Sequence, residues 1–314
     1  MKLKNTFAFI IPLVVLPMLL NGQQANVNLD YNPQKDTEGL IPFSAPIEPD
    51  MYAYHFNVDG IQMTDPSNTV AAFTAMPPYS QLIVHGAEPD YYDARNVPHG
   101  NVTRHIYHSE VTLGERELYV YTPPGYDPDN SYPVLYLLGG SGELPSNWMY
   151  DGRANLILDN LLAEGKAVPM IIVLPNNQVI PLVDSCYSVI KDPAGRAISG
   201  LSMGGRHAMY IGFRSLDQFG SFGILSAGDV NAETSIAYFL NDPEVNRKVD
   251  YLFVGQGKEE ANGFMGNRCV ALHEALTNHN IEHDYYVGGH GGHDWATWRH
   301  LLYYQFLPNL WRIK

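Results

Sequence analysis

The feature that most restricts the fold is an alternation of short apolar runs with helix-like segments, which begins at residue 105. The run Tyr132 to Leu138 is almost continuously apolar, which is typical of a central strand buried on both faces of a sheet. The segment Arg153 to Lys166 instead repeats its apolar residues at helical spacing. Further strand candidates are Met170–Leu174, Arg196–Gly200, Phe222–Leu225, Tyr251–Val254 and Tyr285–Val287, and further helix candidates are Asn267–Asn278 and a segment from Asp294. The alternation predicts an α/β domain with a doubly wound, mostly parallel sheet at residues 101–314.

The N-terminal end has the charge and apolarity order of a secretory signal peptide. Lys2 and Lys4 precede an apolar run from Phe7 to Leu20, and small and polar residues follow it. The run is short for a membrane span. We therefore expect a signal peptide at residues 1–22 and a secreted or periplasmic chain with no membrane anchor.

Residues 23–100 predict a small all-β unit that begins with a polar, turn-rich arm. Met51 to Val58 alternates apolar and polar residues, and Asp59-Gly60 is a strong hairpin signal before Ile61 to Thr64. We expect this unit to end near residue 100.

Composition excludes some partners. The formal net charge of -14 disfavours binding to nucleic acid or to an anionic membrane, because the field of the protein would repel phosphates. The chain has two cysteines, Cys186 and Cys269, which either pair or remain separate buried thiols. They do not have the spacing of a structural zinc site. The sequence leaves the oligomeric state open.

The motif Gly200 to Gly204, of sequence GLSMG, predicts a nucleophile elbow with Ser202 as the nucleophile. It follows the apolar residues Ala197 and Ile198 and precedes a helix candidate, which is the strand-turn-helix setting that such an elbow requires. Its glycines leave room for a sharp turn. The alternative is a glycine-rich turn that carries an inert serine.

A serine nucleophile needs a base, and the base needs a group that fixes its tautomer. We expect His293 to be the base, in a glycine-rich loop after the last strand candidate, with His290 as the alternative. We expect Glu260, after the strand Tyr251 to Val254, to be the acid. Glu259 and Asp294 are the rival acids.

The oxyanion formed during attack requires two preorganised donors. The N–H of Met203 follows the nucleophile, and the loop Gly139 to Gly142 offers the N–H of Ser141. The alternative for that loop is a flexible connection. Trp148 and Trp295 either flank a substrate pocket or pack in the core.

The histidines near the C-terminus are candidate metal ligands, but we do not favour a metal site there. His279 and His283 are four residues apart, and His290, His293 and Asp294 cluster. However, the first pair straddles the expected end of a helix, and no H-E-x-x-H motif is present. We expect neither a metal nor a cofactor.

Four motifs together resemble the esterase D-like family, and within it carbohydrate esterase family 1, which contains the feruloyl and acetylxylan esterases. They are Tyr132–Leu138, Gly152–Asn155, Gly200–Gly205, and Gly292–Trp295 with Trp298-Arg299. The resemblance implies an α/β-hydrolase fold and a serine esterase with a Ser-His-Glu mechanism. It also implies a substrate of acylated xylan or xylo-oligosaccharide, from which feruloyl or acetyl groups are removed. Pro49–Asp65 and Pro98–Gly100 resemble part of an immunoglobulin-like, glycogen-binding-type module.

Three departures from the family pattern keep other functions open. Gly139 occupies the position of the family's usual histidine, the interval from Asn176 to Gly195 is short and contains Pro181 and Pro193, and the N-terminal module is truncated. The alternatives are a siderophore esterase, an acyltransferase, or a catalytically silent glycan-binding protein.

Overall fold

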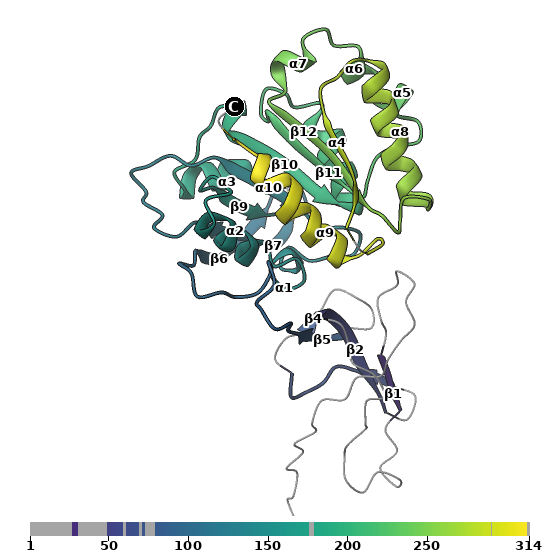
Figure 1. The fold of residues 1–314 in the computed structure, drawn as a ribbon. Helices are drawn as coiled ribbons and strands as arrows, with labels where there is room; N and C mark the ends of the chain where they lie inside the picture. Colours follow the sequence, from purple (N-terminus) through teal and green to yellow (C-terminus); the bar gives the residue numbers. More distant parts are fainter. Residues whose placement is uncertain are drawn as a thin grey trace, which may run out of the picture. The chain divides into compact units, whose positions relative to one another are not determined.

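The computed structural model describes residues 27–30, 49–58, 61–68, 71–72, 79–175, 179–289 and 291–312 (Figure 1). The chain divides into two compact units, Met1–Gly86 and Ala87–Lys314. The signal peptide expected at residues 1–22, the turn at Asp59-Gly60 and the alternative base His290 lie outside the described residues.

The division comes upstream of the boundary that the sequence suggested near residue 100. His99 and Gly100, at the suggested boundary, form hydrogen bonds with Asp159 in a helix of the second unit. Asp159 accepts hydrogen bonds from the Gly100 N–H at 2.9 Å and the Tyr121 hydroxyl at 2.6 Å, and its other oxygen lies 2.8 Å from His99 Nδ1. This buried carboxylate explains why residues 87–100 group with the α/β unit.

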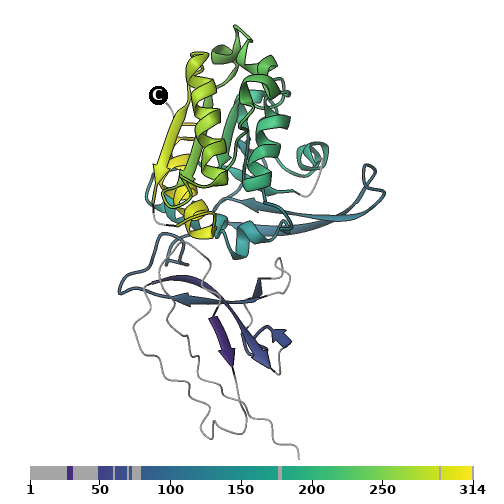
Figure 2. The ribbon, with the colours of Figure 1, turned by 90° about the vertical axis from the view of Figure 1, so that its right-hand side faces the viewer.

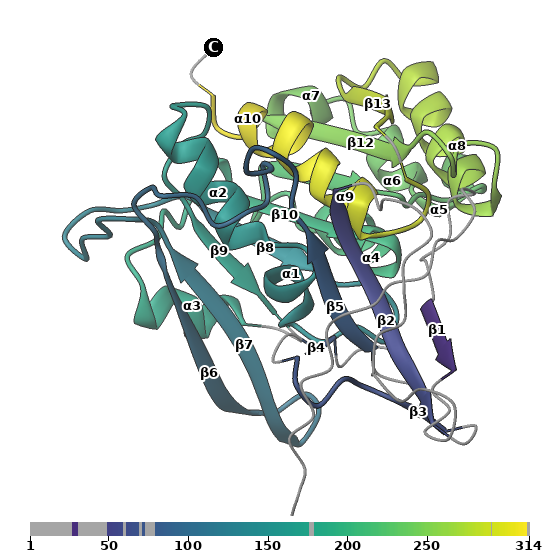
Figure 3. The ribbon, with the colours of Figure 1, turned by 60° about the horizontal axis from the view of Figure 1, so that its bottom comes forward.

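The first unit is a small sheet of order β1-β2-β5-β4, and a further strand, β3, pairs with the end of β2 (Figure 3). Its strands are β1 (Val27–Asp30), β2 (Asp50–Val58), β3 (Ile61–Met63), β4 (Ala71–Ala72) and β5 (Tyr79–Val84). β2 and β3 are antiparallel with Val58 opposite Ile61, as the hairpin signal predicted. The buried Tyr54 hydroxyl donates to Asp65 at 2.7 Å, which anchors the segment after β3 to β2.

The second unit is built on an eight-stranded sheet of order β13-β12-β11-β10-β8-β9-β7-β6. Its strands are β6 (Asn101–Ser109), β7 (Gly114–Thr122), β8 (Val134–Leu138), β9 (Ile171–Leu174), β10 (Arg196–Leu201), β11 (Ser221–Leu225), β12 (Tyr251–Gly257) and β13 (Asp284–Gly288). The six strands from β8 to β13 run parallel, and β7 and β6 are antiparallel additions at one edge. The β6–β7 hairpin projects well beyond the rest of the sheet (Figure 2). The predicted mostly parallel sheet is confirmed.

Helices cover both faces of this sheet, because successive strand residues point to opposite sides. On one face, the ring of Phe222 in β11 lies against Gly212 of α4 (Ser202–Gly212), where a Cβ would be 2.7 Å from it. On the other face, a Cβ at the neighbouring Gly223 would lie 2.7 Å from Phe306, in the C-terminal helical segment. That segment comprises α9 (Trp295–Leu301), the π-helical turn η2 (Leu302–Phe306) and α10 (Leu307–Asn309). The sheet is therefore doubly wound, as expected.

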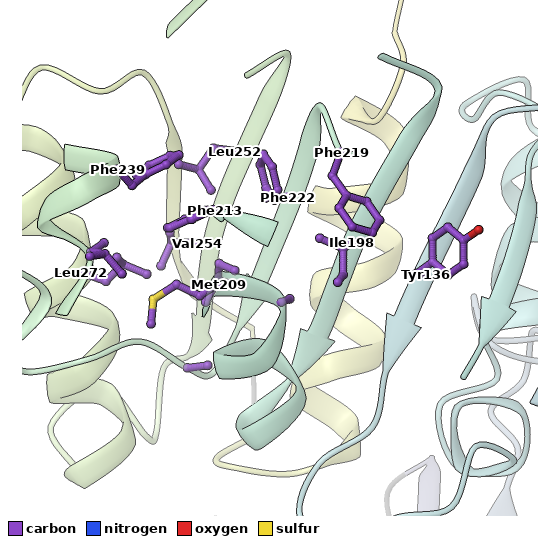
Figure 4. Close-up of a cluster of buried hydrophobic side chains, with 14 of the residues drawn as sticks. Tyr136, Ile198, Met209, Phe213, Phe219, Phe222, Phe239, Leu252, Val254 and Leu272 are labelled. Atoms are coloured by element: carbon purple, nitrogen blue, oxygen red, sulfur yellow. The ribbon is translucent and has the colours of Figure 1, made fainter. Parts of the chain in front are cut away.

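The main hydrophobic cluster lies on the α4 face of the sheet (Figure 4). Phe213, just after α4, stacks on Phe239 with ring centroids 3.9 Å apart, and it meets Phe222 edge to face at 5.4 Å. Burial of such large rings is the dominant stabilising contribution in a core of this kind. The cluster holds α4 firmly against β10 and β11, which fixes the residue at its N-terminus.

The remaining helices are short, apart from two. They are α1 (Asn147–Tyr150), α2 (Ala154–Ala163), α3 (Ile180–Cys186), the 3-10 turn η1 (Pro193–Gly195), α5 (Ala232–Ser235), α6 (Ala237–Leu240), α7 (Val245–Lys248) and α8 (Phe264–Asn278). α3 has only seven residues and lies in the short interval that contains Pro181 and Pro193. Among the described helices, none combines the length and apolarity that crossing a membrane requires.

Candidate active site

Ser202 stands at the sharp junction between β10 and α4. Its φ is +52°, a left-handed conformation that residues other than glycine rarely adopt. The neighbouring glycines allow this turn: a Cβ at Gly200 would lie 2.6 Å from the Gly204 carbonyl carbon, and a Cβ at Gly204 would lie 2.3 Å from the Gly139 oxygen. The turn directs the serine hydroxyl toward the loop after β13.

His293 lies between Ser202 and a carboxylate. Its Nε2 is 2.9 Å from Ser202 Oγ, and its Nδ1 is 2.8 Å from Glu260 Oε2. Because an ionised carboxylate only accepts hydrogen bonds, Nδ1 carries the proton and Nε2 is left to accept from the hydroxyl. The His293 side chain is 33% exposed and that of Glu260 only 5%. The hydrogen-bonded chain thus runs from a buried acid to an accessible serine.

Glu260 is held by three donors. Besides His293, the Gly257 N–H donates to Oε1 at 2.9 Å, and the Ser226 hydroxyl donates to the same oxygen. Sequence reasoning did not identify Ser226, which follows β11 with a φ of +48°. A serine after an apolar strand carries no distinguishing signal.

The two rival acids lie elsewhere. Glu259 is exposed, and its backbone N–H bonds to Gly291 O at 3.3 Å. Asp294 caps α9: its two oxygens accept from the Thr297 N–H at 3.1 Å and the Gly292 N–H at 3.0 Å. Among the described candidates, the structure therefore brings Glu260 to His293.

The expected oxyanion donors come from the elbow itself and from the turn after β8. Met203 is the second residue of α4, so its N–H has no acceptor within the helix. Ser141 is exposed in the turn after β8. The close approach of Gly204 to the Gly139 carbonyl packs that turn against the elbow.

Glu143 is a residue of this loop that the sequence analysis missed. Its Oε2 accepts from the Gly140 N–H at 2.6 Å. A Cβ at Gly139 would lie 3.1 Å from that oxygen, so Glu143 fills the space beside the position of the family's usual histidine. Burial raises the pKa of Glu143 to about 7, although the bond from Gly140 opposes the shift. The only indication of Glu143 in the sequence is a carboxylate directly after the glycine-rich run Gly139 to Gly142.

Trp148 and Trp295 are not presented to a ligand, which corrects the prediction that they flank a substrate pocket. They are 1% and 8% exposed, and their rings meet edge to face at 5.1 Å. Trp148 also donates its indole N–H to the Leu138 carbonyl at 2.9 Å. Both rings pack in the core between α1, α9 and the end of β8, the alternative that the sequence had left open.

The other reactive side chains are dispersed. His283 Nε2 lies 2.8 Å from His273 Nδ1, whereas His279 lies 2.9 Å from Glu233. Within the described residues, no three His, Cys, Asp or Glu side chains are grouped to hold a metal ion. Cys186 is exposed and Cys269 is buried, and both are free thiols.

The chain is similar to known esterases. A family model described as "Putative esterase" matches residues 109–178 and 175–307. The chain is 32% identical over 302 residues to an endo-1,4-beta-xylanase/feruloyl esterase of Xylanibacter ruminicola, an alignment that covers 86% of this chain and 40% of that protein. The chain therefore spans less than half the length of this relative.

Two solved structures are similar as well. A ferulic acid esterase is 28% identical with a TM-score of 0.59, over 68% of this chain and 98% of that one. A family 1 carbohydrate esterase of Anaeromyces mucronatus, solved with ferulic acid, is 25% identical with a TM-score of 0.62, over 71% and 95% of the two chains. These similarities confirm the expected α/β-hydrolase fold.

Proposed function

The chain belongs to the esterase family, as a member similar to the feruloyl esterases of carbohydrate esterase family 1, and on that premise we propose that it is a serine esterase that removes feruloyl groups from acylated xylan. One observation carries the proposal: the hydrogen-bonded chain from Glu260 through His293 to Ser202. Such a chain activates a hydroxyl that is otherwise a weak nucleophile at neutral pH.

The first half of the reaction forms an acyl-enzyme. Ser202 Oγ attacks the ester carbonyl while His293 Nε2 takes the hydroxyl proton, and Glu260 stabilises the resulting imidazolium. The N–H groups of Met203 and Ser141 are the proposed donors to the oxyanion. His293 then gives its proton to the departing sugar hydroxyl.

In the second half, His293 takes a proton from a water molecule as that water attacks the acyl carbon. His293 then gives the proton to Ser202 Oγ while the bond between Oγ and the acyl carbon breaks, which releases the free acid and restores the serine hydroxyl. The partial exposure of His293 supports this step, because water must reach the imidazole. An extracellular polysaccharide as substrate also agrees with the signal peptide that we expect at residues 1–22.

The relatives favour feruloyl over other acyl groups. One carries both xylanase and feruloyl esterase in its name, and the Anaeromyces mucronatus structure holds ferulic acid. We therefore expect xylan or xylo-oligosaccharides that bear feruloyl esters to be cleaved faster than acetylated xylan or a catecholate siderophore ester.

The test compares four substrates: feruloylated arabinoxylan, acetylated xylan, a catecholate siderophore ester and an aryl acetate. We expect a pre-steady-state burst on the aryl acetate and the highest kcat/KM on the feruloylated substrate, with all activity lost in Ser202→Ala. An unchanged rate in Ser202→Ala would refute the serine mechanism. Faster cleavage of the siderophore ester, or diversion of the acyl group to added sugar, would refute the substrate assignment.

A further inference from the structure

The turn after β8 is held on both sides of Gly140 by one residue, Glu143. Its side-chain oxygen Oε2 accepts from the Gly140 N–H at 2.6 Å, and its backbone N–H donates to the Gly140 carbonyl oxygen at 3.4 Å. Gly142, between the two residues, has a φ of +76°, the left-handed value that the third position of a type II turn requires. The backbone bond is long, so the carboxyl group is the stronger of the two restraints.

These two bonds fix the direction of the Ser141 N–H. The Gly140 carbonyl and the Ser141 N–H belong to one planar trans peptide group, so they point to opposite sides of the chain. Because the Gly140 carbonyl is directed at the Glu143 N–H, the Ser141 N–H points away from it. Rotation of this peptide group would put a carbonyl oxygen where the proposed oxyanion donor stands.

Gly140 also contacts the nucleophile elbow. A Cβ at Gly140 would lie 2.8 Å from Leu201 Cδ1 and 3.4 Å from Glu143 Oε2. Leu201 immediately precedes Ser202, and Glu143 and Met203 line the same pocket. Gly140 therefore lies between the elbow and the carboxyl group, so a displaced carboxyl group would release the turn from the elbow.

The surroundings of the Glu143 carboxyl group favour its neutral form. Burial raises its pKa to about 7, and Asp151 at the end of α1 acts in the same direction, whereas the Gly140 N–H and His293 favour the ionised form. His207 of α4 lines the same pocket. A neutral carboxyl group still accepts from Gly140 through its carbonyl oxygen. The clamp on the turn therefore persists in both protonation states, but only the ionised one adds a negative charge to the site.

We propose that Glu143 is a positioning residue of the oxyanion site: its carboxyl group holds the peptide between Gly140 and Ser141 so that the Ser141 N–H faces the oxyanion, and it serves best as the neutral acid. The proposal rests on the proposed esterase function. An anion at this position would oppose the negative charge that develops on the ester carbonyl oxygen in the transition state.

The first test removes the clamp or keeps it. We expect Glu143→Ala to lower kcat on an aryl acetate roughly 10²-fold with KM nearly unchanged, because the donor it orients acts in the transition state. Glu143→Gln still offers an oxygen to Gly140, so it should restore most of the kcat at pH 6. Glu115→Ala, at an exposed carboxylate of β7, is the control. Equal losses in both Glu143 variants, or wild-type kcat in Glu143→Ala, would overturn the proposal.

The second test concerns the charge. The kcat of Glu143→Gln divided by that of the wild type cancels pH effects that the two proteins share. We expect this ratio to rise roughly threefold or more between pH 6 and pH 8, since only the wild type acquires the negative charge. A merely structural role would leave the ratio constant. A constant ratio would refute the preference for the neutral acid.

Nuclear magnetic resonance of protein labelled with ¹⁵N-glycine reports on the clamp without a substrate. We expect the Gly140 amide resonance to shift with pH, with a midpoint near 7, in both the wild type and Ser202→Ala, and to lose this shift in Glu143→Gln. A resonance that does not titrate would show that Glu143 does not hold the turn, even in an active esterase. Equal hydrolysis of an aryl acetate by wild type and Ser202→Ala would instead refute the esterase function, and the oxyanion role with it, even where the resonance titrates.

Discussion

Glu143 accepts a hydrogen bond from the Gly140 N–H at 2.6 Å, in the loop that also carries Ser141. The carboxyl group lies beside Gly139, where a side chain would approach it to 3.1 Å. The glycine and the glutamate therefore depend on each other. A side chain at position 139 would crowd the carboxyl group of Glu143.

We predict that Glu143 makes the protein less stable at alkaline pH. Its pKa is raised from 4.5 to about 7 by burial, so the folded state binds a proton more tightly than the unfolded state. This contribution is fully present below pH 4.5 and is lost as the pH rises through 7. Glu143→Gln keeps an acceptor for Gly140 without the ionisation.

We expect the free energy of unfolding of the wild type, relative to Glu143→Gln, to fall by about 2 kcal/mol between pH 5 and pH 8. Denaturant unfolding at the two pH values measures it, with Glu259→Gln as the control for an exposed carboxylate. A wild type that shows the same pH dependence as Glu143→Gln would contradict the prediction.

Replacement of Glu260 by glutamine should lower kcat by a factor of about 10² to 10⁴ with little change in KM. The amide has only one acceptor atom, so either the Nδ1–H of His293 or the N–H of Gly257 then faces a donor. Steady-state kinetics on an aryl acetate measures the loss. Glu259→Gln should retain wild-type kinetics, and an equal loss in both variants would argue against Glu260 as the acid.

Sequence patterns singled out Ser202, Glu260 and His293, which the structure brings within hydrogen-bonding distance, because each follows a strand of a parallel sheet. The carboxyl ends of such strands meet at one edge, so order along the chain suffices to bring their loops together. The burial of Trp148 and Trp295 depends instead on how α1 and α9 pack, which periodicity does not encode. Likewise, the sequence around Glu143 is typical of a solvated loop residue. Its burial depends on the conformation of the turn after β8.

The two thiols should behave independently. Cys269 donates to the Ala227 carbonyl at 2.9 Å, and burial raises its pKa, whereas Cys186 is exposed. We expect a thiol reagent to label Cys186 rapidly in the native protein and Cys269 only after unfolding. Reducing agent should leave Tm unchanged. A lower Tm under reducing conditions would instead indicate a disulfide.

Asp294 adjoins His293, and its replacements separate a structural role from a catalytic one. Asp294→Ala removes the cap of α9 and the acceptor for Gly292, so we expect a loss of about 1 to 2 kcal/mol in the free energy of unfolding. Asparagine caps a helix about as well as aspartate, so Asp294→Asn should keep most of the stability. It should also keep most of kcat, because Asp294 bonds to backbone N–H groups while Glu260 bonds to the imidazole. If Asp294 were the acid, the neutral amide would reduce kcat by at least 10²-fold while the fold remained intact. Denaturant unfolding and steady-state kinetics on the same two variants distinguish these cases.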